Sequence, residues 1–504
     1  MLVRSPLIAV LSLGGCLGDG TTELADDSAT FTDAPIASAA TPARAEGQVM
    51  VLFGQSSPDL SQFRAEVLDV DPSFPRPSGI TLYTNIVPGA CSGLDGPCDL
   101  GGNVNDFGLS LSEYPEGVLS VGLYLSDNYA GCTNQPLRAL VGQDDPDLTD
   151  GLGQQYRDEM DTLITYLQGT GRDVLLRIGY EFDGPWNCYN NELYIQAFQY
   201  VSDRIDDLGA TNIIKVWQSA TYAQDGDPAF NYDFTNPDHF DVWYPGDEYV
   251  DWVGISTFSW DNSYQAHQWS CLVPTTNPQF NYDNALDFAR DHGKPVLIAE
   301  STPTAYRTAD LDAGCILGNF GSSPVEPEQI WSDWYAPFFQ YIHDNDDVIA
   351  AVAYINSDWE AIAQFNCAPG ASAGDPNCTD GYWGNSRIQD NAFILDQFAA
   401  QMADLLGEDD GSGDSGDSGD SGDSGDDGGA STSGGASEGE GSASTMAASG
   451  TEGPSDDGDS GSTGEPAQDE SGSGGSGCRT TARPGVPGVL GLMVLLLGGR
   501  RRRS

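Results

Sequence analysis

The chain has 504 residues, with 76 acidic side chains against 20 basic ones and a formal net charge of −56. This acidity argues against nucleic acid as a partner, because the phosphate backbone is itself negatively charged. We attribute it to the solubility of an exported protein rather than to a specific ligand.

The first 15 residues are expected to form an export signal, because Arg4 precedes a short apolar run from Leu7 to Leu13. The stretch Leu13-Gly-Gly-Cys16 resembles the lipobox of bacterial lipoproteins, which implies lipidation of Cys16. An ordinary signal peptide that is cut nearby remains the alternative. Residues 16–46 are rich in Thr, Ala and Asp, and we expect them to form a linker.

Strand-like and helix-like stretches alternate from residue 47 to residue 407. Eight strands, most of them followed by a helix, predict an α/β fold with a single (β/α)8 barrel and long loops. A doubly wound sheet is the alternative, but it would need a glycine-rich phosphate turn after its first strand, and Gly54-Gln-Ser-Ser57 is not one. The expected strands are 49–53, 79–85, 118–125, 174–183, 213–217, 252–258, 296–300 and 349–355, and the expected helices are 156–167, 194–208, 285–292, 331–342 and 393–406.

Residues 408–477 contain no Lys, Arg or aromatic side chain and repeat Gly, Asp and Ser. Such a segment cannot bury enough apolar surface to fold, so we predict a disordered acidic spacer. In 478–504, Cys478, an apolar run and a terminal arginine cluster together resemble the myxobacterial-type C-terminal sorting tag. The apolar run is shorter than the roughly 20 residues of a free-standing transmembrane helix. The resemblance implies attachment to the outer membrane or cell surface through a terminus.

Ten cysteines are present, and setting aside Cys16 and Cys478 leaves an even number in an exported chain. This suggests up to four disulfides, although on the order of a hundred pairings are possible. No Cys-x-x-Cys motif or His/Cys cluster suggests zinc, so we expect no metal or other cofactor. Separately, we expect the protein to be a monomer. We predict the pairs 91–98, 132–188, 271–315 and 367–378, because each would join neighbouring loops on one barrel face.

The stretch 173–186, Asp-Val-Leu-Leu-Arg-Ile-Gly-Tyr-Glu-Phe-Asp-Gly-Pro-Trp, begins as a strand. Val174, Leu176 and Ile178 are expected to face the helices, and Arg177 and Glu181 to lie on the opposite face. A carboxylate at the carboxyl end of a barrel strand is in the position where such barrels place catalytic residues.

A second such carboxylate, Glu300, ends the strand that begins at Val296, and Val296, Ile298 and Glu300 are expected to share one face. Two carboxyl groups about 5–5.5 Å apart are what a retaining glycosidase needs. One attacks the anomeric carbon, and the other is a proton donor that repulsion and burial keep protonated. Arg177 could keep a carboxylate charged; alternatively, Arg177 and Glu181 form a buried structural ion pair.

Three segments in this order resemble glycoside hydrolase family 26: Arg177-x-x-x-Glu181-x-x-Gly184-x-Trp186, Tyr244-Pro-Gly-Asp-Glu-Tyr-Val-Asp-Trp-Val-Gly254, and Pro295-Val-x-Ile-Ala-Glu300. The resemblance implies that Glu181 is the acid/base and Glu300 the nucleophile, and that no cofactor is needed. It also implies a retaining endo-β-glycanase whose partner is a plant or algal polysaccharide.

Three positions depart from the family pattern, which implies altered contacts with sugar hydroxyls and with the nucleophile. Tyr180 replaces the usual histidine, Asp183 the usual asparagine, and Phe258 a frequent tyrosine. The family includes β-1,4-mannanases, β-1,3-xylanases and mixed-linkage β-glucanases, and this chain resembles the β-1,3-xylanase branch most. A catalytically inactive, polysaccharide-binding barrel is the alternative.

Aromatic side chains near strand ends suit sugar binding, because sugar rings stack their C–H faces on aromatic rings. Gln218 and Asn356 could bond sugar hydroxyls, or could equally satisfy neighbouring backbone groups. Core packing is the alternative for each tryptophan, above all for Trp217 within a strand. The candidate tryptophans are Trp186, Trp217, Trp260, Trp269 and Trp359.

Overall fold

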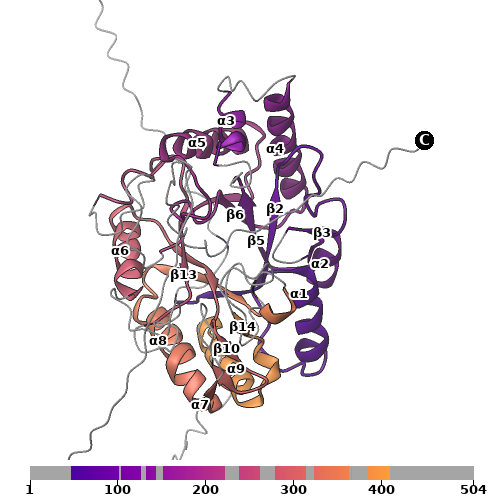
Figure 1. Ribbon diagram of the computed structural model, residues 1–504, viewed down its shortest axis with the longest axis vertical. Helices are drawn as coiled ribbons and strands as arrows, with labels where there is room; N and C mark the ends of the chain where they lie inside the picture. Colours follow the sequence, from indigo (N-terminus) through magenta and orange to yellow (C-terminus); the bar gives the residue numbers. More distant parts are fainter. Residues whose placement is uncertain are drawn as a thin grey trace, which may run out of the picture.

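The computed structural model describes residues 42, 47–100, 104–126, 132–142, 151–221, 238–260, 278–313, 323–362, 365 and 383–408. Its centre is a closed barrel of eight parallel strands, surrounded by helices, in the order β1-β13-β9-β8-β7-β6-β5-β2 (Figure 1). The prediction of a single (β/α)8 barrel is confirmed. The barrel strands are β1 (Met50–Gly54), β2 (Gly79–Asn85), β5 (Val118–Tyr124), β6 (Val174–Ile178), β7 (Ile213–Ser219), β8 (Trp252–Thr257), β9 (Val296–Ser301) and β13 (Ile349–Ile355).

Seven barrel strands coincide with expected ones to within two residues at either end, whereas β6 begins as expected but ends at Ile178, before the predicted break at Gly184 and Pro185. These segments are recognisable because they are rich in apolar and β-branched residues and are buried on both faces, as parallel strands are. Four two-residue strands form a small sheet, and two more pair with each other, outside the barrel. They are β10 (Tyr306–Arg307), β11 (Asp312–Ala313), β12 (Ser323–Pro324) and β14 (Gly384–Asn385) in the first sheet, and β3 (Cys98–Asp99) and β4 (Val104–Asn105) in the second.

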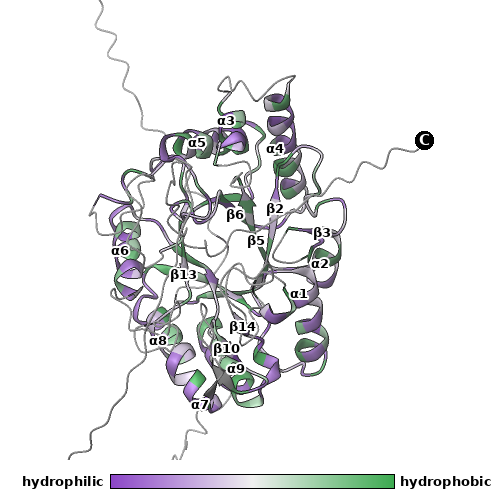
Figure 2. Cartoon of the chain, in the orientation of Figure 1, coloured by the Kyte–Doolittle hydropathy of each residue, from purple (hydrophilic) through white to green (hydrophobic). Residues whose placement is uncertain are grey.

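Several helices begin where a polar side chain accepts a hydrogen bond from an N–H group of the first turn. Asp106, Asn190 and Asn391 cap three of them in this way, and such a cap stabilises a helix by about 1 kcal/mol. The apolar and polar residues of the helices lie on separate faces (Figure 2). The helices are α1 (Ser57–Phe63), α2 (Phe107–Glu113), α3 (Gln135–Leu140), α4 (Leu152–Gly169), α5 (Asn191–Asp207), α6 (Pro278–Asp291), α7 (Pro327–Ile330), α8 (Ala336–Asp344) and α9 (Ala392–Leu406).

The helix expected over 331–342 is not uniform. A wider helical turn, Trp331–Tyr335, separates α7 from α8. Pro337 lies in the first turn of α8 and has no N–H group. It therefore cannot donate to the preceding turn, and a local widening of the helix is a common way to accommodate such a lost bond.

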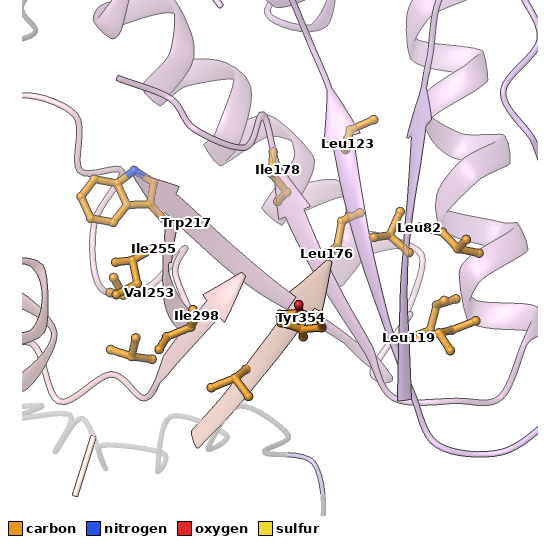
Figure 3. Close-up of a cluster of buried hydrophobic side chains, with 14 of the residues drawn as sticks. Leu82, Leu119, Leu123, Leu176, Ile178, Trp217, Val253, Ile255, Ile298 and Tyr354 are labelled. Carbon is orange, nitrogen blue, oxygen red and sulfur yellow. The ribbon is translucent and has the colours of Figure 1, made fainter. Parts of the chain in front are cut away.

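Two layers of apolar side chains hold the barrel together. The outer layer lies between strands and helices and includes Leu176, Ile178 and Ile298 (Figure 3). The inner layer fills the barrel with residues such as Leu175 and Trp252. The alternation predicted along β6 is thereby confirmed, because Val174, Leu176 and Ile178 all belong to the outer layer.

Two of the predicted disulfides, Cys91–Cys98 and Cys132–Cys188, are confirmed. The pairs 271–315 and 367–378 lie outside the described residues. So do the expected signal, all of the expected linker except Pro42, the acidic spacer beyond Glu408 and the expected sorting tag. In the described part of the chain, no helix has the length and apolar character needed to cross a membrane.

Asp59 connects the start of α1 to Ser357, two residues beyond the end of β13. Its Oδ2 accepts hydrogen bonds from Ser56 Oγ at 2.7 Å and from Ser357 Oγ at 3.0 Å. Burial raises the pKa of Asp59 from 3.8 to about 6, because the charged form loses its hydration.

This pKa predicts a pH-dependent stability. The folded-state pKa lies above the ordinary one, so the contribution is fully present below about pH 4 and is lost as the pH rises through 6. We expect the free energy of unfolding of wild type, relative to Asp59→Asn, to fall by about 3 kcal/mol between pH 4 and pH 7. Urea unfolding of both proteins at several pH values measures this difference, and parallel pH profiles would contradict it.

Candidate active site

Glu181 lies beyond the end of β6 rather than on it. The strand stops at Ile178, earlier than the sequence pattern suggests, and Gly179 and Glu181 then adopt left-handed backbone angles, with φ of 55° and 52°. For a residue such as glutamate this conformation costs about 1–2 kcal/mol. The side-chain amide of Asn187 stabilises the turn by donating to the carbonyls of Tyr180 and Glu181 at 3.0 and 2.9 Å.

The Glu181 carboxyl group is buried, with 1% of the residue exposed. Its Oε2 accepts a hydrogen bond from Trp186 Nε1 at 2.9 Å, and its Oε1 accepts one from Ser256 Oγ at 2.8 Å. Burial raises the pKa of Glu181 well above its ordinary value, and the nearby charge of Glu300 raises it further. A carboxyl group in this environment suits a proton donor.

Glu300 reaches the barrel interior through an irregularity in β9. Val296 and Ile298 belong to the outer layer, whereas Leu297 and Ala299 belong to the inner one. Regular alternation would therefore turn Glu300 outward, and the expectation that it shares a face with Val296 and Ile298 is wrong. Ile298 pairs with Ile255 of β8, but Glu300 pairs with the next residue, Ser256, so β9 holds one extra residue here. Such a bulge redirects the following side chain, in this case inward.

Inside the barrel, Glu300 forms an ion pair with Arg177. Arg177 Nη1 lies 2.8 Å from Glu300 Oε1, and both side chains are buried. The guanidinium group also donates to Gln218 Oε1 at 3.2 Å and to Thr81 Oγ1 at 3.0 Å. The sequence left open a structural pair between Arg177 and Glu181, but the bonded partner of Arg177 is Glu300.

Aromatic rings and a glycine make room for this arginine. Its guanidinium carbon lies 4.7 Å from the ring centre of Tyr83 and 5.6 Å from that of Tyr180, a favourable arrangement for a cation. A Cβ atom at Gly122 would come within 2.6 Å of the Tyr83 ring and 2.9 Å of Arg177 Nη2. Only a glycine therefore fits at this position of β5.

Gln218 and Ser256 connect the two glutamates. Gln218 Nε2 donates to Ser256 Oγ at 3.1 Å and lies 3.5 Å from Glu300 Oε1. Ser256 Oγ in turn donates to Glu181. Hydrogen bonds through one amide and one hydroxyl group thus link the two carboxyl groups at the carboxyl end of the barrel, and the predicted contact of Gln218 with a sugar stays a prediction.

Tyr180 also lies at this site. It is 3% exposed, and its ring packs edge-on against Tyr83 at 5.3 Å between ring centres. Its hydroxyl oxygen has no hydrogen-bond partner among the described residues. Burial raises the pKa of the Tyr180 phenol well above its ordinary value, so it remains a neutral hydrogen-bond donor.

Asp183 is fully buried, and protein donors occupy its carboxylate. Oδ2 accepts from Ser219 Oγ at 2.6 Å and lies 3.0 Å from His239 Nε2. Oδ1 accepts from the backbone N–H of Ala220 at 2.7 Å. This arrangement favours a structural role for Asp183 over the predicted contact with a sugar.

Asn356 and three aromatic candidates are engaged elsewhere in the protein. Asn356 donates to Gln389 Oε1 at 2.9 Å and accepts from the N–H of Ile388 at 2.9 Å, so it satisfies its neighbours. Trp359 is completely buried. Trp260 and Trp217 belong to the outer layer between strands and helices. The packing role that the sequence left open is favoured for all three tryptophans.

Phe258 and Trp186 keep some exposure. Phe258 is 8% exposed and packs edge-on against Trp383 at 5.5 Å between ring centres. Trp186 is 6% exposed and bonds Glu181 directly. Trp269 lies outside the described residues.

Sequence reasoning missed Thr81, Tyr83, Ser256 and His239, which contact the predicted residues. Thr81 and Ser256 lie on barrel strands with their side chains inward, a position that a count along each strand could have identified. Among the described residues, no group of three or more His, Cys, Asp or Glu side chains could hold a metal ion. A cavity of about 490 Å³ lies at the opposite, amino end of the strands, between Met50, Val118 and Asp173.

Comparison with known proteins connects this geometry to a family. Residues 132–285, which include Glu181 but not Glu300, match glycosyl hydrolase family 26. The chain is 33% identical over 342 residues to a β-1,3-xylanase of Vibrio sp., covering 65% of this chain and 60% of that protein. It is 34% identical over 330 residues to a β-1,3-xylanase of Alcaligenes sp., covering 64% of this chain and 58% of that protein.

The chain thus spans about three fifths of the length of these curated relatives. Among solved structures, a modular endo-β-1,4-mannanase from Cellulomonas fimi aligns with 15% identity over 72% of each chain and a TM-score of 0.41. The family match and the two sequence relatives together support the relationship to glycosyl hydrolase family 26 that the three motifs predict.

Proposed function

We propose that this chain is a glycoside hydrolase that acts on O-glycosyl bonds: a retaining endo-β-glycanase that cleaves β-1,3-xylan. The observation that carries the proposal is the unequal environment of two glutamates at one end of the barrel. Glu300 is bonded to a buried arginine, whereas Glu181 is bonded to neutral donors and has a raised pKa. Opposite environments for a pair of carboxyl groups are the usual basis for assigning one as acid and the other as nucleophile.

In the proposed reaction, Glu300 attacks the anomeric carbon while Glu181 donates its proton to the leaving oxygen. A covalent glycosyl–enzyme forms, and Glu181 then takes a proton from the water that releases the sugar. Glu300 Oε1 is held by Arg177, and Oε2 accepts no hydrogen bond from the described residues. Oε2 is therefore the oxygen that is available to attack.

The substrate is proposed from the relatives, since the two curated proteins described above are β-1,3-xylanases. The rings of Tyr83 and Tyr180 beside Arg177 add an aromatic surface close to the nucleophile, which suits the C–H face of a sugar. A pentose, which has no hydroxymethyl group at its C5 position, needs the least room beside these rings.

Incubating the full chain with β-1,3-xylan, β-mannan and mixed-linkage β-glucan, and analysing the products, tests the proposal. We expect β-1,3-xylo-oligosaccharides from wild type, and at least about 100-fold slower release of them from Glu181→Gln and Glu300→Ala. Cleavage of β-mannan alone would support the proposed reaction and contradict the proposed substrate. Binding without cleavage by a folded wild type would instead support the alternative of an inactive polysaccharide-binding barrel.

We further propose that the protein is exported and attached to the cell surface. The two disulfides among the described residues support export, because disulfides persist in oxidising compartments. The expected signal and sorting tag are the basis for attachment. Fractionation of producing cells, with and without residues 478–504, tests whether the tag retains the protein at the surface.

A further inference from the structure

His239 is a buried, ionisable side chain that the proposed reaction does not use. It is 3% exposed and lies 56 residues along the chain from Asp183, which its Nε2 contacts at 3.0 Å. A carboxylate only accepts hydrogen bonds, so Nε2 must carry the proton in this contact. Burying a polar pair of this kind costs desolvation free energy, so a role for the pair in the site would account for its presence.

Asp183 connects His239 to the end of β7. Its carboxylate accepts from Ser219 Oγ and from the N–H of Ala220, at 2.6 and 2.7 Å. One residue earlier, the N–H of Phe182 donates to the carbonyl of Gln218 at 3.0 Å. The segment that follows Glu181 is thus fastened to β7 by one backbone bond and by the Asp183 carboxylate.

The same cluster reaches the Glu181 carboxyl group from its other side. Ser219 Oγ accepts from the N–H of Thr221 at 2.9 Å, and Thr221 Oγ1 donates to the carbonyl of Ser256 at 2.6 Å. Ser256 Oγ is a hydrogen-bond donor to Glu181. The bonds that start at His239 therefore fix both the backbone of Glu181 and one of its two side-chain donors.

The backbone at Glu181 needs such support. Glu181 has a φ of 52° and Thr221 a φ of 45°, and this left-handed backbone conformation is unfavourable for residues other than glycine. Strained residues persist only where the surrounding structure holds them. An error of about 1 Å in the position of a catalytic group can cost on the order of 100-fold in rate.

We propose that His239 is a positioning residue: through Asp183 it holds the turn that carries Glu181, and so orients the proton donor of the reaction. This inference rests on the proposed function. It assigns to Asp183 the role of connecting His239 to this turn, in place of a contact with the substrate.

The test compares two substrates with His239→Ala and Asp183→Ala. Cleavage of a polysaccharide needs a proton from Glu181, whereas a dinitrophenyl β-glycoside of the same sugar has a leaving group that departs without one. We expect kcat/KM for β-1,3-xylan to fall about 100-fold, because a misplaced acid loses most of its contribution. The value for the dinitrophenyl glycoside should fall less than about 3-fold.

Two further variants complete the kinetic test. His239→Gln retains a nitrogen donor and should recover at least about a tenth of the wild-type value for the polysaccharide. His343→Ala is the matched control, since His343 lies on α8 and pairs with Asp404 at 3.5 Å, away from Glu181; it should leave both substrates unaffected. Equal losses on both substrates would overturn the proposal and indicate a general structural role.

Hydrogen exchange gives a readout that does not depend on activity. In His239→Ala, the amides of Gly184 and Ala220 should exchange faster than in wild type, and in His343→Ala they should not. Unchanged exchange would overturn the positioning role. If wild type cleaves neither substrate, the proposed function fails, and the exchange data alone decide whether His239 holds this turn.

Discussion

Glu300→Ala is expected to lower kcat/KM for β-1,3-xylan by about 10⁵-fold, because it removes the nucleophile itself. Glu181→Ala should lower it by about 10²–10⁴-fold, the range that a general acid contributes. The two losses differ because the two residues have different roles, and their environments are the basis for these roles. Glu300 is bonded to Arg177, whereas Glu181 is a buried carboxyl group with a raised pKa.

Azide distinguishes the two roles by the stereochemistry of its product. In Glu181→Ala, Glu300 still forms the glycosyl–enzyme from an activated substrate, and azide then attacks from the opposite side, so the product keeps the β configuration. In Glu300→Ala, azide takes the place of the nucleophile and gives an α-glycosyl azide. Proton NMR of the anomeric hydrogen identifies the two products.

Glu116→Ala is the matched control, because Glu116 lies at the amino end of the barrel beside the 490 Å³ cavity. It should leave the rate unchanged. An α-azide from Glu181→Ala, or a β-azide from Glu300→Ala, would contradict the assignment of roles. Full activity in either glutamate variant would contradict the proposed function.

The barrel was predictable because each of its strands can be recognised from a short stretch of neighbouring residues. Each strand is an apolar run bounded by turn residues, and eight such runs alternating with helical patterns leave few folds to consider. The disulfide Cys132–Cys188 was predictable for a related reason: both cysteines belong to loops at the carboxyl ends of barrel strands, β5 and β6.

The bulge in β9 was not predictable, because it depends on register with the neighbouring strands. Counting in steps of two along Val296, Ile298 and Glu300 assumes a regular strand, and one extra residue inverts the result. Glu300 was still identified as a candidate, because a carboxylate at the carboxyl end of a barrel strand indicates a site whichever face of the strand the count assigns to it.

Contacts between distant segments explain the other differences. Nothing near His239 in the sequence indicates that it meets Asp183, and nothing near Asn356 indicates that Gln389 and Ile388 satisfy it. Trp359 follows a strand end, as a sugar-binding residue would, yet Phe365 and Trp383 pack around it at 4.9 and 5.0 Å between ring centres. Only the folded chain decides between packing and binding for such residues.

Arg177→Met is expected to lower the free energy of unfolding by about 3–5 kcal/mol, the usual cost of breaking a buried ion pair by removing one partner. Arg177 is fully buried and bonds Glu300, Gln218 and Thr81. Its removal leaves the Glu300 charge without compensation and two polar groups without a donor. Urea unfolding measures the change.

The double variant Arg177→Met/Glu300→Gln separates the charge from the packing. It removes both charges, so we expect it to be more stable than Arg177→Met by about 2 kcal/mol or more, although a second native side chain, Glu300, is also replaced. Arg177→Lys keeps a positive charge but lacks the planar guanidinium group that reaches Glu300 and Thr81 together. Its free energy of unfolding should therefore lie between those of wild type and Arg177→Met.

Additive losses in the double variant would contradict this expectation, because they would mean that Arg177 stabilises the barrel by packing against Tyr83 and Tyr180 and not by compensating Glu300. Recovery of stability without recovery of activity is the expected result. It would mean that the arginine stabilises the barrel mainly by compensating the charge of the nucleophile, a charge that the reaction needs and that folding does not.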